Sequence, residues 1–508
     1  MPDKEYLIGV DIGTLGSKGV IIDDEGKILS SYFVEHGIDV LRPGWVEQDP
    51  ERIYWTDFRT IVRKLIAESG VSPGKIVAVG VSSLSPDACP VDENGNPVRP
   101  ALIYMDRRSV KECQMVREIL GEDYVVKLTG NAVDPYFAGY KMLWIMQNEP
   151  ENYKKTWKFL NACKYVVNKL TDVASVDISN AALSGPFYDV SKKVWSETVC
   201  SALGFDREKL PDVFELGDVI GAVTKRGSSE TLLPEGAPVV SCAVDGLMSF
   251  YSVGCLDPGD AVLMYGTTGV MGIISDKPVW DPRFVNTYYI GGRVIHAVAM
   301  IATGALVRWF RDEFGVAEKE VERLAKLDAY SLLDRMAEKI SPGSDGLVVL
   351  PYFMGERTPI WDPLARGVVI GLTLYHSRAH VYRALLESAG YALKQHILIA
   401  NQLGIFIKRI LAVNGGARSK LWRQIISDII GMPQLYSSKV SGAPFGDAFL
   451  AGVAVKIFQK PEDIRKLVVI DEETKPIIEN TVKYERLYSV FDGLYAKLKD
   501  DMHAVATL

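Results

Sequence analysis

Two short segments that combine glycine with hydroxyl side chains occur half a chain apart and could bind phosphate groups. Residues 13–19 read Gly-Thr-Leu-Gly-Ser-Lys-Gly, and residues 266–272 read Gly-Thr-Thr-Gly-Val-Met-Gly. A turn of this composition presents backbone N–H groups together with a hydroxyl, which suits a phosphate chain. The glycines are expected where positive φ or close backbone approach is needed. The repeat predicts two related halves that grip a nucleotide from both sides of a cleft.

Charged residues beside the first segment add further ligands. Asp11 ends the preceding apolar run, a position from which a carboxylate can hold Mg²⁺ through water. Lys18 lies just beyond the turn and can reach a phosphate oxygen. The second copy has Met264 in place of Asp11, so only the first half is equipped for the metal, and Thr267 and Thr268 are expected to address the phosphates from the other side. For either copy alone, a structural hairpin is the alternative.

A further acid, Asp245, follows the apolar run 239–244 and precedes Gly246. An acid at the carboxyl end of a buried strand projects into the crevice where such sheets bind ligands. In phosphoryl transfer, an aspartate there can take the proton of the acceptor hydroxyl. The alternative is that Asp245 caps the helix that follows.

Two other segments are weaker candidates. The glycine-containing turn 414–419 follows a predicted strand and could let an adenine lie against bare backbone, although such strand-to-helix loops are common. In the segment 104–109, Asp106 could accept sugar hydroxyls while Tyr104 stacks on a sugar face, and a surface salt-bridge cluster is the alternative. Four histidines lack metal-ligand spacing and are expected to be structural: His296, His376, His380 and His396.

Alternating apolar patterns predict the elements that position these residues. The opening of the chain reads as a three-stranded meander, followed by an amphipathic helix and a buried strand (6–11, 18–23 and 28–35; 50–68; 76–82). The second half repeats the meander and adds a buried strand, a long helix, a short strand and a further helix (343–351, 379–402, 411–413, and a helix starting within 447–457). A boundary near Val253 divides the chain into two α/β domains, 1–253 and 254–508.

The composition narrows the class of protein. A net charge of −7 spread along 508 residues disfavours nucleic acid or an anionic membrane as partner. The six cysteines are scattered without a C-x-x-C pair, which favours reduced, mostly buried thiols in a cytoplasmic protein. The N-terminus lacks the layout of a signal peptide, and no apolar run approaches the roughly 20 residues that span a bilayer. A soluble, cytoplasmic enzyme is expected.

Over nearly its whole length the chain resembles the FGGY carbohydrate kinases. The residues that carry the resemblance are a C-terminal signature (367–372, 380–381 and 384–387), a segment typical of the xylulokinase branch (350–359 with Trp361 and Asp362), and the segment 43–50. The N-terminal signature at 136–148 is looser, since it keeps Lys141 and Trp144 but has Ala138 where Pro, Ser or Thr is usual.

The resemblance implies two ribonuclease-H-like, actin-like ATPase domains with a cleft between them, and ATP with Mg²⁺ as cofactors. It implies that Asp245 is the catalytic base. The nucleotide-binding positions it implies are Asp11, Gly13, Thr14, Lys18, Gly266, Thr267, Thr268, Gly304, Gly415, Gly416 and Ala417. The sugar-binding positions it implies are Tyr104, Asp106 and Tyr136. Dimers are common in the family, so a homodimer is an expectation.

One segment departs from the family. Xylulokinases carry Gln-Met-His-Gly after the strand that ends near Ser82, and glycerol kinases carry Gln-Arg-Glu-Thr, whereas residues 84–87 read Leu-Ser-Pro-Asp. A site built for particular hydroxyls rejects analogues strongly, so this change disfavours D-xylulose itself, and glycerol more. Asp87 is the candidate for a replacement sugar contact. A ketopentose of the xylulose or ribulose type remains the expected acceptor; a polyol or sugar acid is one alternative, and an inactive sugar or nucleotide sensor is another.

Overall fold

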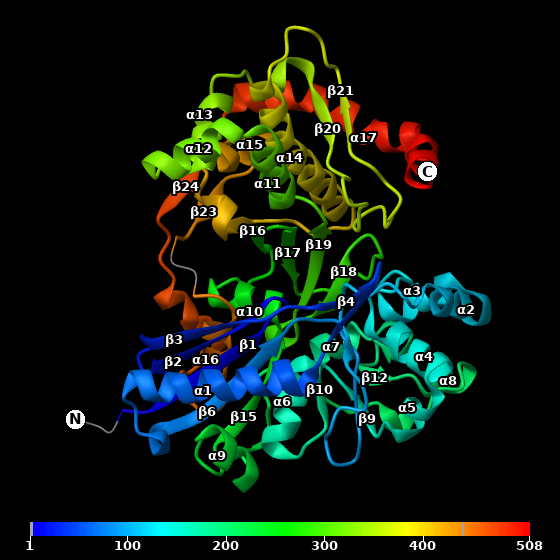
Figure 1. Ribbon diagram of the computed structural model, residues 1–508, viewed down its shortest axis with the longest axis vertical. Helices are drawn as coiled ribbons and strands as arrows, with labels where there is room; N and C mark the ends of the chain where they lie inside the picture. Colours follow the sequence, from blue (N-terminus) through cyan, green and yellow to red (C-terminus); the bar gives the residue numbers. More distant parts are fainter. Residues whose placement is uncertain (1–3, 439–440) are drawn as a thin grey trace.

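The computed structural model describes residues 4–438 and 441–508 and shows two α/β lobes, one above the other (Figure 1). Each lobe is built on a mixed β-sheet with helices packed against it. The lower lobe carries most of the first half of the chain, and the upper lobe carries most of the second half. In the described part of the chain, no helix is both long and apolar enough to cross a membrane. All six cysteines are buried and free.

The sheet of the lower lobe has the strand order β14-β15-β6-β1-β2-β3. Strands β1, β2 and β3 form the predicted antiparallel meander, and β6 and β15 add parallel strands on the other side of β1. Its strands are β1 (Tyr6–Ile12), β2 (Gly16–Asp23), β3 (Ile28–Glu35), β6 (Ile76–Ser83), β14 (Val219–Ala222) and β15 (Pro238–Val244).

The sheet of the upper lobe repeats this arrangement. Its order is β18-β19-β17-β16-β22-β23-β24, in which β16, β17 and β19 form an antiparallel meander while β22 and β23 continue in parallel from β16. Its strands are β16 (Asp260–Tyr265), β17 (Gly269–Ser275), β18 (Val285–Tyr288), β19 (Val294–Met300), β22 (Arg409–Val413), β23 (Gln434–Tyr436) and β24 (Glu472–Thr474). The repeat seen in the sequence is therefore a repeat of the fold.

The remaining strands form small sheets: β4 (Asp39–Arg42), β5 (Trp45–Gln48) and β8 (Ala101–Leu102); β7 (Cys89–Val91) and β9 (Lys158–Leu160); β10 (Ser175–Asp177) and β13 (Asp212–Phe214); β11 (Tyr188–Asp189) and β12 (Val194–Trp195); β20 (Val348–Leu350) and β21 (Val368–Ile370). The helices are α1 (Thr56–Ser69), α2 (Val110–Leu120), α3 (Glu122–Thr129), α4 (Ala138–Asn148), α5 (Pro150–Lys155), α6 (Ala162–Thr171), α7 (Ile178–Ala182), α8 (Glu197–Ala202), α9 (Lys225–Thr231), α10 (Asp245–Ser252), α11 (Gly304–Phe314), α12 (Val316–Ala325), α13 (Ala329–Ala337), α14 (Arg378–Gln402), α15 (Lys420–Ile430), α16 (Ala443–Ala454) and α17 (Ile478–Ala506).

Helix α16, although it comes late in the chain, packs on strands β1 and β6 of the first sheet (Figure 1). Glycines make this approach possible, because a Cβ atom on Gly9 would lie 1.9 Å from the Pro444 carbonyl oxygen. A Cβ atom on Gly80 would lie 2.5 Å from the Asp447 carbonyl oxygen. The helix begins at Ala443, ahead of the predicted start, since Pro444 suits a first helical turn. The division of the chain near Val253 stays a prediction.

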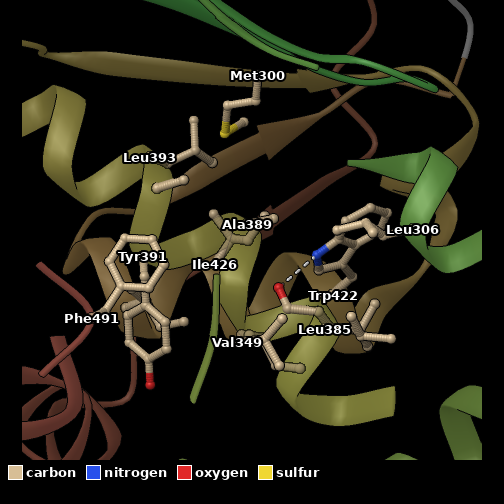
Figure 2. Packing of buried hydrophobic residues seen from close by; sticks show 14 of the residues in the cluster. Met300, Leu306, Val349, Leu385, Ala389, Tyr391, Leu393, Trp422, Ile426 and Phe491 are labelled. Atoms are coloured by element: carbon tan, nitrogen blue, oxygen red, sulfur yellow. Dashed lines mark hydrogen bonds between the residues drawn. The ribbon is translucent and has the colours of Figure 1, made fainter. Parts of the chain in front are cut away.

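A large apolar core fills the upper lobe between its sheet and helices α14, α15 and α17 (Figure 2). Trp422 is almost fully buried in it, and its indole N–H donates a 3.1 Å hydrogen bond to the carbonyl oxygen of Leu386. Burying the indole with a satisfied N–H fixes the orientation of the ring. Trp422 and Leu386 also line the cavity described below, so this core forms part of its floor.

Candidate active site

The first glycine turn joins β1 to β2 and places Asp11 directly opposite Lys18 in the ladder. Gly13 is required for close approach, because a Cβ atom on it would lie 2.5 Å from the carbonyl oxygen of Gly16. Thr14 stands at the tip, and its hydroxyl donates to the hydroxyl of Tyr104 at 3.4 Å. The turn is therefore a tight hairpin that faces Tyr104, one of the predicted sugar contacts.

Two side chains that the sequence did not single out, His36 and Gln48, contact backbone carbonyl oxygens of this turn. The Nε2 atom of His36 lies 3.0 Å from the carbonyl oxygen of Gly13, and its Nδ1 atom lies 2.7 Å from Asp57 on α1. The side-chain amide of Gln48 donates to the carbonyl oxygen of Thr14 at 2.9 Å. Because their carbonyl oxygens are held by these contacts, Gly13 and Thr14 have a fixed orientation. Gln48 lies in the segment 43–50 that carries the family resemblance, and that segment could have pointed to it. No motif in the sequence includes His36.

The second glycine turn joins β16 to β17 and is held by the start of α11. The backbone N–H of Gly304 donates to the Gly266 carbonyl oxygen at 2.9 Å, and that of Ala305 donates to the Thr267 carbonyl oxygen at 3.0 Å. A Cβ atom on Gly304 would lie 2.4 Å from the Gly266 carbonyl oxygen, so only glycine permits this contact. Thr267 is exposed and Thr268 partly exposed at the turn.

A cavity of about 980 Å³ adjoins the second turn and brings five of the predicted nucleotide-binding residues together. The predicted residues that line it are Gly266, Thr267, Gly304, Gly415 and Gly416. Ala417 is fully buried, and its carbonyl oxygen accepts a hydrogen bond from Arg423. Lining residues that sequence reasoning missed include Asp328, Tyr330, Asp334, Arg335 and Tyr382. A cavity of this size, lined by glycine backbone and by aromatic rings such as Tyr265 and Trp422, suits a nucleotide.

Asp11 and Asp245 stand near the carboxyl ends of β1 and β15, with β6 between them. Carboxyl ends of parallel strands meet at one edge of a sheet, which explains how side chains so far apart in the sequence come together. Burial raises the pKa of Asp11, and the positive charge of Lys18 opposes this. Burial, and then the negative charge of Asp11, raises the pKa of Asp245 to about 7. An acid with a pKa near neutrality is suited to accept a proton at working pH.

Asp245 is the first residue of α10, and the backbone N–H of Gly246 donates to its Oδ1 atom at 2.6 Å. The positive end of a helix favours a nearby carboxylate. The N-cap position itself is Val244, so the bond from Gly246 is the contact by which Asp245 satisfies a free N–H of the first turn, and this part of the capping alternative is met.

A third buried acid, Asp447 of α16, is connected to Asp11 through the hydroxyl of Ser82. The hydroxyl of Ser82 donates to the Oδ2 atom of Asp447 at 2.6 Å and lies 3.4 Å from the Oδ1 atom of Asp11. Burial raises the pKa of Asp447 well above its usual range, and the charge of Asp11 adds to the effect. Ser82 thus links α16 to the carboxylate predicted to hold the metal.

The predicted sugar contacts Tyr104 and Tyr136 lie together near Asp245. Their ring centroids are 6.3 Å apart in an edge-to-face arrangement. Burial raises the pKa of Tyr136 to about 12, the positive charge of Arg357 opposes this, and the charges of Tyr104 and Asp245 add to it. Tyr104 also contacts Thr14 of the first phosphate turn, and the charge of Asp245 acts on Tyr136, so the two rings lie near both groups.

Asp106 and Asp87 have other surroundings than predicted. Asp106 is fully buried; its oxygens accept hydrogen bonds from the guanidinium of Arg108 at 2.7–2.9 Å and from the Val46 N–H at 2.7 Å. These contacts fit the salt-bridge alternative, in a buried form, and a sugar contact by Asp106 stays a prediction. Asp87 is 1 % exposed and lines a small cavity of about 10 Å³ with Met142 and Trp195. Burial raises its pKa well above the usual range.

The carboxylates at the strand ends match the oxygen ligands that Mg²⁺ prefers. Mg²⁺ keeps several waters and takes one or two carboxylates together with substrate phosphates. Asp11 and Asp245, beside a phosphate-type turn, fit that donor set. Among residues 4–438 and 441–508, no group of three His, Cys, Asp or Glu side chains is arranged to hold a metal by itself.

Two of the four histidines that were predicted to be structural are buried and have hydrogen-bond partners: His296 contacts Asn286, and His396 contacts Thr358.

Comparison with known proteins places this geometry in a family. The chain is 30% identical to a glycerol kinase of Enterobacter sp. (strain 638), with 96% of each chain covered, and 27% identical to a gluconokinase of Bacillus subtilis (strain 168), with 99% of this chain and 98% of the relative covered. The crystal structure of a xylulose kinase from Rhodospirillum rubrum superimposes with a TM-score of 0.91 at 28% identity, over 98% of this chain and all of that one. The two-lobed fold with actin-like ATPase topology is thereby confirmed. Models of the N-terminal and C-terminal domains of the FGGY family of carbohydrate kinases match residues 6–251 and 261–455, and the chain belongs to this family.

Proposed function

We propose that the protein transfers the γ-phosphate of ATP, with Mg²⁺, to a hydroxyl of a small sugar. The observation that carries the proposal is the convergence of Asp11, Lys18 and Asp245 beside the first glycine turn, while the second turn borders a nucleotide-sized cavity. The gap between these two turns is where a phosphate chain would pass from one lobe to the other.

In this proposal Asp245 acts as the general base. Its carboxylate accepts the proton of the acceptor hydroxyl as that oxygen attacks the γ-phosphorus, and the bond to the ADP oxygen breaks. The raised pKa of Asp245 matches a base that works near neutral pH. Most of the acceleration is expected from positioning and charge neutralisation, because the transition state of phosphoryl transfer is loose.

The remaining roles follow from the surroundings of each residue. Asp11 would hold the metal, which neutralises charge on the phosphates when it is bound. Lys18, Gly13 and Thr14 would bind the transferred phosphoryl group from the lower lobe, and Thr267 would bind the phosphates from the upper lobe. Gly304, Gly415 and Gly416 would let the nucleotide lie against bare backbone, and Thr268 and Ala417 would complete the two nucleotide-binding segments.

The proposed acceptor is a ketopentose of the xylulose or ribulose type, bound against Tyr104 and Tyr136. The similarity to a xylulose kinase structure supports this class. A sugar acid is the second candidate, because a gluconokinase is similarly related and because the guanidinium of Arg357 lies over the ring of Tyr136. Residues 84–87 differ from the sugar-contacting segment of the family, so the choice between a ketopentose and a sugar acid is made by the assay below. A cytoplasmic location is supported by six free cysteines, and a homodimer stays a prediction.

The test is an ADP-release assay with ATP and Mg²⁺ across ketopentoses, ketohexoses, polyols and aldonates. One acceptor that turns over well above the acceptor-free background supports a kinase and names its substrate. Silence across the panel, with ATP still bound, would favour the sensor alternative. For Asp87, the substitution Asp87→Ala should raise the acceptor KM if the residue is a sugar contact, while an unchanged KM would assign it to structure alone.

A further inference from the structure

The loop 356–362 of the upper lobe is closed and rigidly held. The backbone groups of Glu356 and Asp362 exchange two hydrogen bonds of 2.9 Å at its base. The hydroxyl of Thr358 accepts from the backbone N–H of Ala299 at 2.9 Å, at the end of β19. Asp362 is in turn fixed by Tyr495 of α17. The side chains of this loop are therefore presented from a fixed frame.

The same loop is tied to the nucleotide side of the cleft. The Oε1 atom of Glu356 accepts hydrogen bonds from the backbone N–H groups of Ile301 and Arg357, at 2.9 and 2.8 Å. Ile301 leads directly into Gly304, whose N–H holds the second glycine turn at Gly266. A shift of the loop would thus be transmitted to the turn that faces the phosphates.

The loop also reaches the other lobe, where the sugar is expected. The segment between β20 and β21 descends from the upper lobe toward the lower one (Figure 1). The guanidinium carbon of Arg357 lies 5.6 Å from the ring centroid of Tyr136, and the ring of Trp361 lies 6.3 Å from that of Phe137. The indole of Trp361 donates to the Pro282 carbonyl oxygen at 2.8 Å, which fixes that ring as well.

Arg357 lies beside a predicted sugar contact. Its guanidinium carbon is 5.6 Å from the ring centroid of Tyr136, and the charges of both Arg357 and Asp245 act on the Tyr136 hydroxyl. Among the described residues, no carboxylate forms an ion pair with Arg357, whose side chain is partly exposed. A guanidinium carries five donors in a planar fork. In the described part of the chain these donors form no ion pair, although the charge of Arg357 acts on the buried carboxylate of the neighbouring Glu356.

We propose that Arg357 is an acceptor-binding residue that donates hydrogen bonds to the end of the sugar remote from the hydroxyl that Asp245 deprotonates. This inference rests on the proposed function and deepens it, because it assigns part of the acceptor pocket to the upper lobe. Oxygen atoms of a carboxylate suit the fork of Arg357 best, and those of a carbonyl or neighbouring hydroxyls suit it next.

The experiment compares Arg357→Met and Arg357→Lys with the wild-type enzyme on the acceptor found in the panel. The control is Arg366→Met, since Arg366 belongs to the same segment but bonds only to the carbonyl groups of Pro363 and Ala365 among the described residues. Arg357→Met is expected to lower kcat/KM for the acceptor about 10²-fold, mainly through KM, because a lost charged hydrogen bond discriminates at this scale. The KM for ATP and the slow ATP hydrolysis without acceptor should stay within about twofold, and Arg357→Lys should recover part of the loss.

Two results would overturn the inference. One is an acceptor KM unchanged in Arg357→Met. The other is a parallel rise of both KM values with a lowered Tm, which would make Arg357 a structural link between the lobes. If the wild-type enzyme phosphorylates no acceptor, the proposed function fails first; if it phosphorylates one and Arg357→Met matches Arg366→Met, only this inference fails.

Discussion

Asp11 and Asp245 lie near the carboxyl ends of two parallel strands of one sheet, and the charge of Asp11, after burial, raises the pKa of Asp245. The strand β6 between them carries Ser82, which contacts Asp11. This arrangement separates two roles for two similar side chains. Asp11 keeps Lys18 as a positive neighbour and suits a metal, whereas Asp245 is poised to take a proton.

The first prediction concerns pH. Asp245 must be ionised to accept a proton, and its pKa is raised to about 7, so kcat/KM should fall as the pH drops below that value. Below about pH 6 the fall should approach tenfold per pH unit, since one group is titrated. The measurement is ADP production, quantified directly by chromatography between pH 5 and 9. An acid limb near pH 4, the ordinary range of an aspartate, would contradict the assignment.

The second prediction concerns the contacts that hold the first turn. His36→Ala removes the contact with the Gly13 carbonyl oxygen and should raise the KM for ATP roughly tenfold, because the turn loses its fixed orientation. Gln48→Ala should act in the same direction through Thr14. The control is His376→Ala, a partly exposed histidine far along the chain that contacts the Thr373 hydroxyl. Equal ATP KM values in His36→Ala and the control would remove His36 from the account.

The third prediction concerns stability. Asp447 is fully buried and its pKa is raised in the folded state, so folding favours the protonated form. The contribution of Asp447 to the free energy of unfolding is fully present at pH values below its pKa in the unfolded chain. It is lost as the pH rises through its pKa in the folded protein. Asp447→Asn removes the titration, so its Tm should fall less than that of the wild type between pH 5 and 8. Parallel Tm curves for the two proteins would show that Asp447 does not titrate differently on folding.

The sequence was enough to predict the elements that follow from local pattern. The meander at β1, β2 and β3 and the repeat at β16 and β17 were predicted from alternation and glycine turns, and the structure confirms them. Asp245 was predicted to end a strand because strand ends at glycine are visible in the sequence, and it does follow β15.

Contacts between residues that are far apart in the sequence could not be predicted from local sequence pattern. The surroundings of Asp106 depend on Arg108 and on Val46 from a distant strand, so the buried ion pair of this predicted sugar contact could not be read from local sequence. His36 carries no motif, and its position under Gly13 arises only when β3 folds beside β2. Arg357 was visible within a family-like segment, but its approach to Tyr136 requires the two lobes to meet.

The measurement that tests the central claim most directly is phosphoryl transfer by Asp245→Asn, with ATP binding measured on the same sample. The asparagine keeps the size of the side chain but cannot take the proton. The account predicts that ATP and Mg²⁺ bind as in the wild type while turnover of the acceptor falls by at least ~10², the usual scale for a general base. Near-normal turnover in this variant would contradict the account and assign the proton to another group.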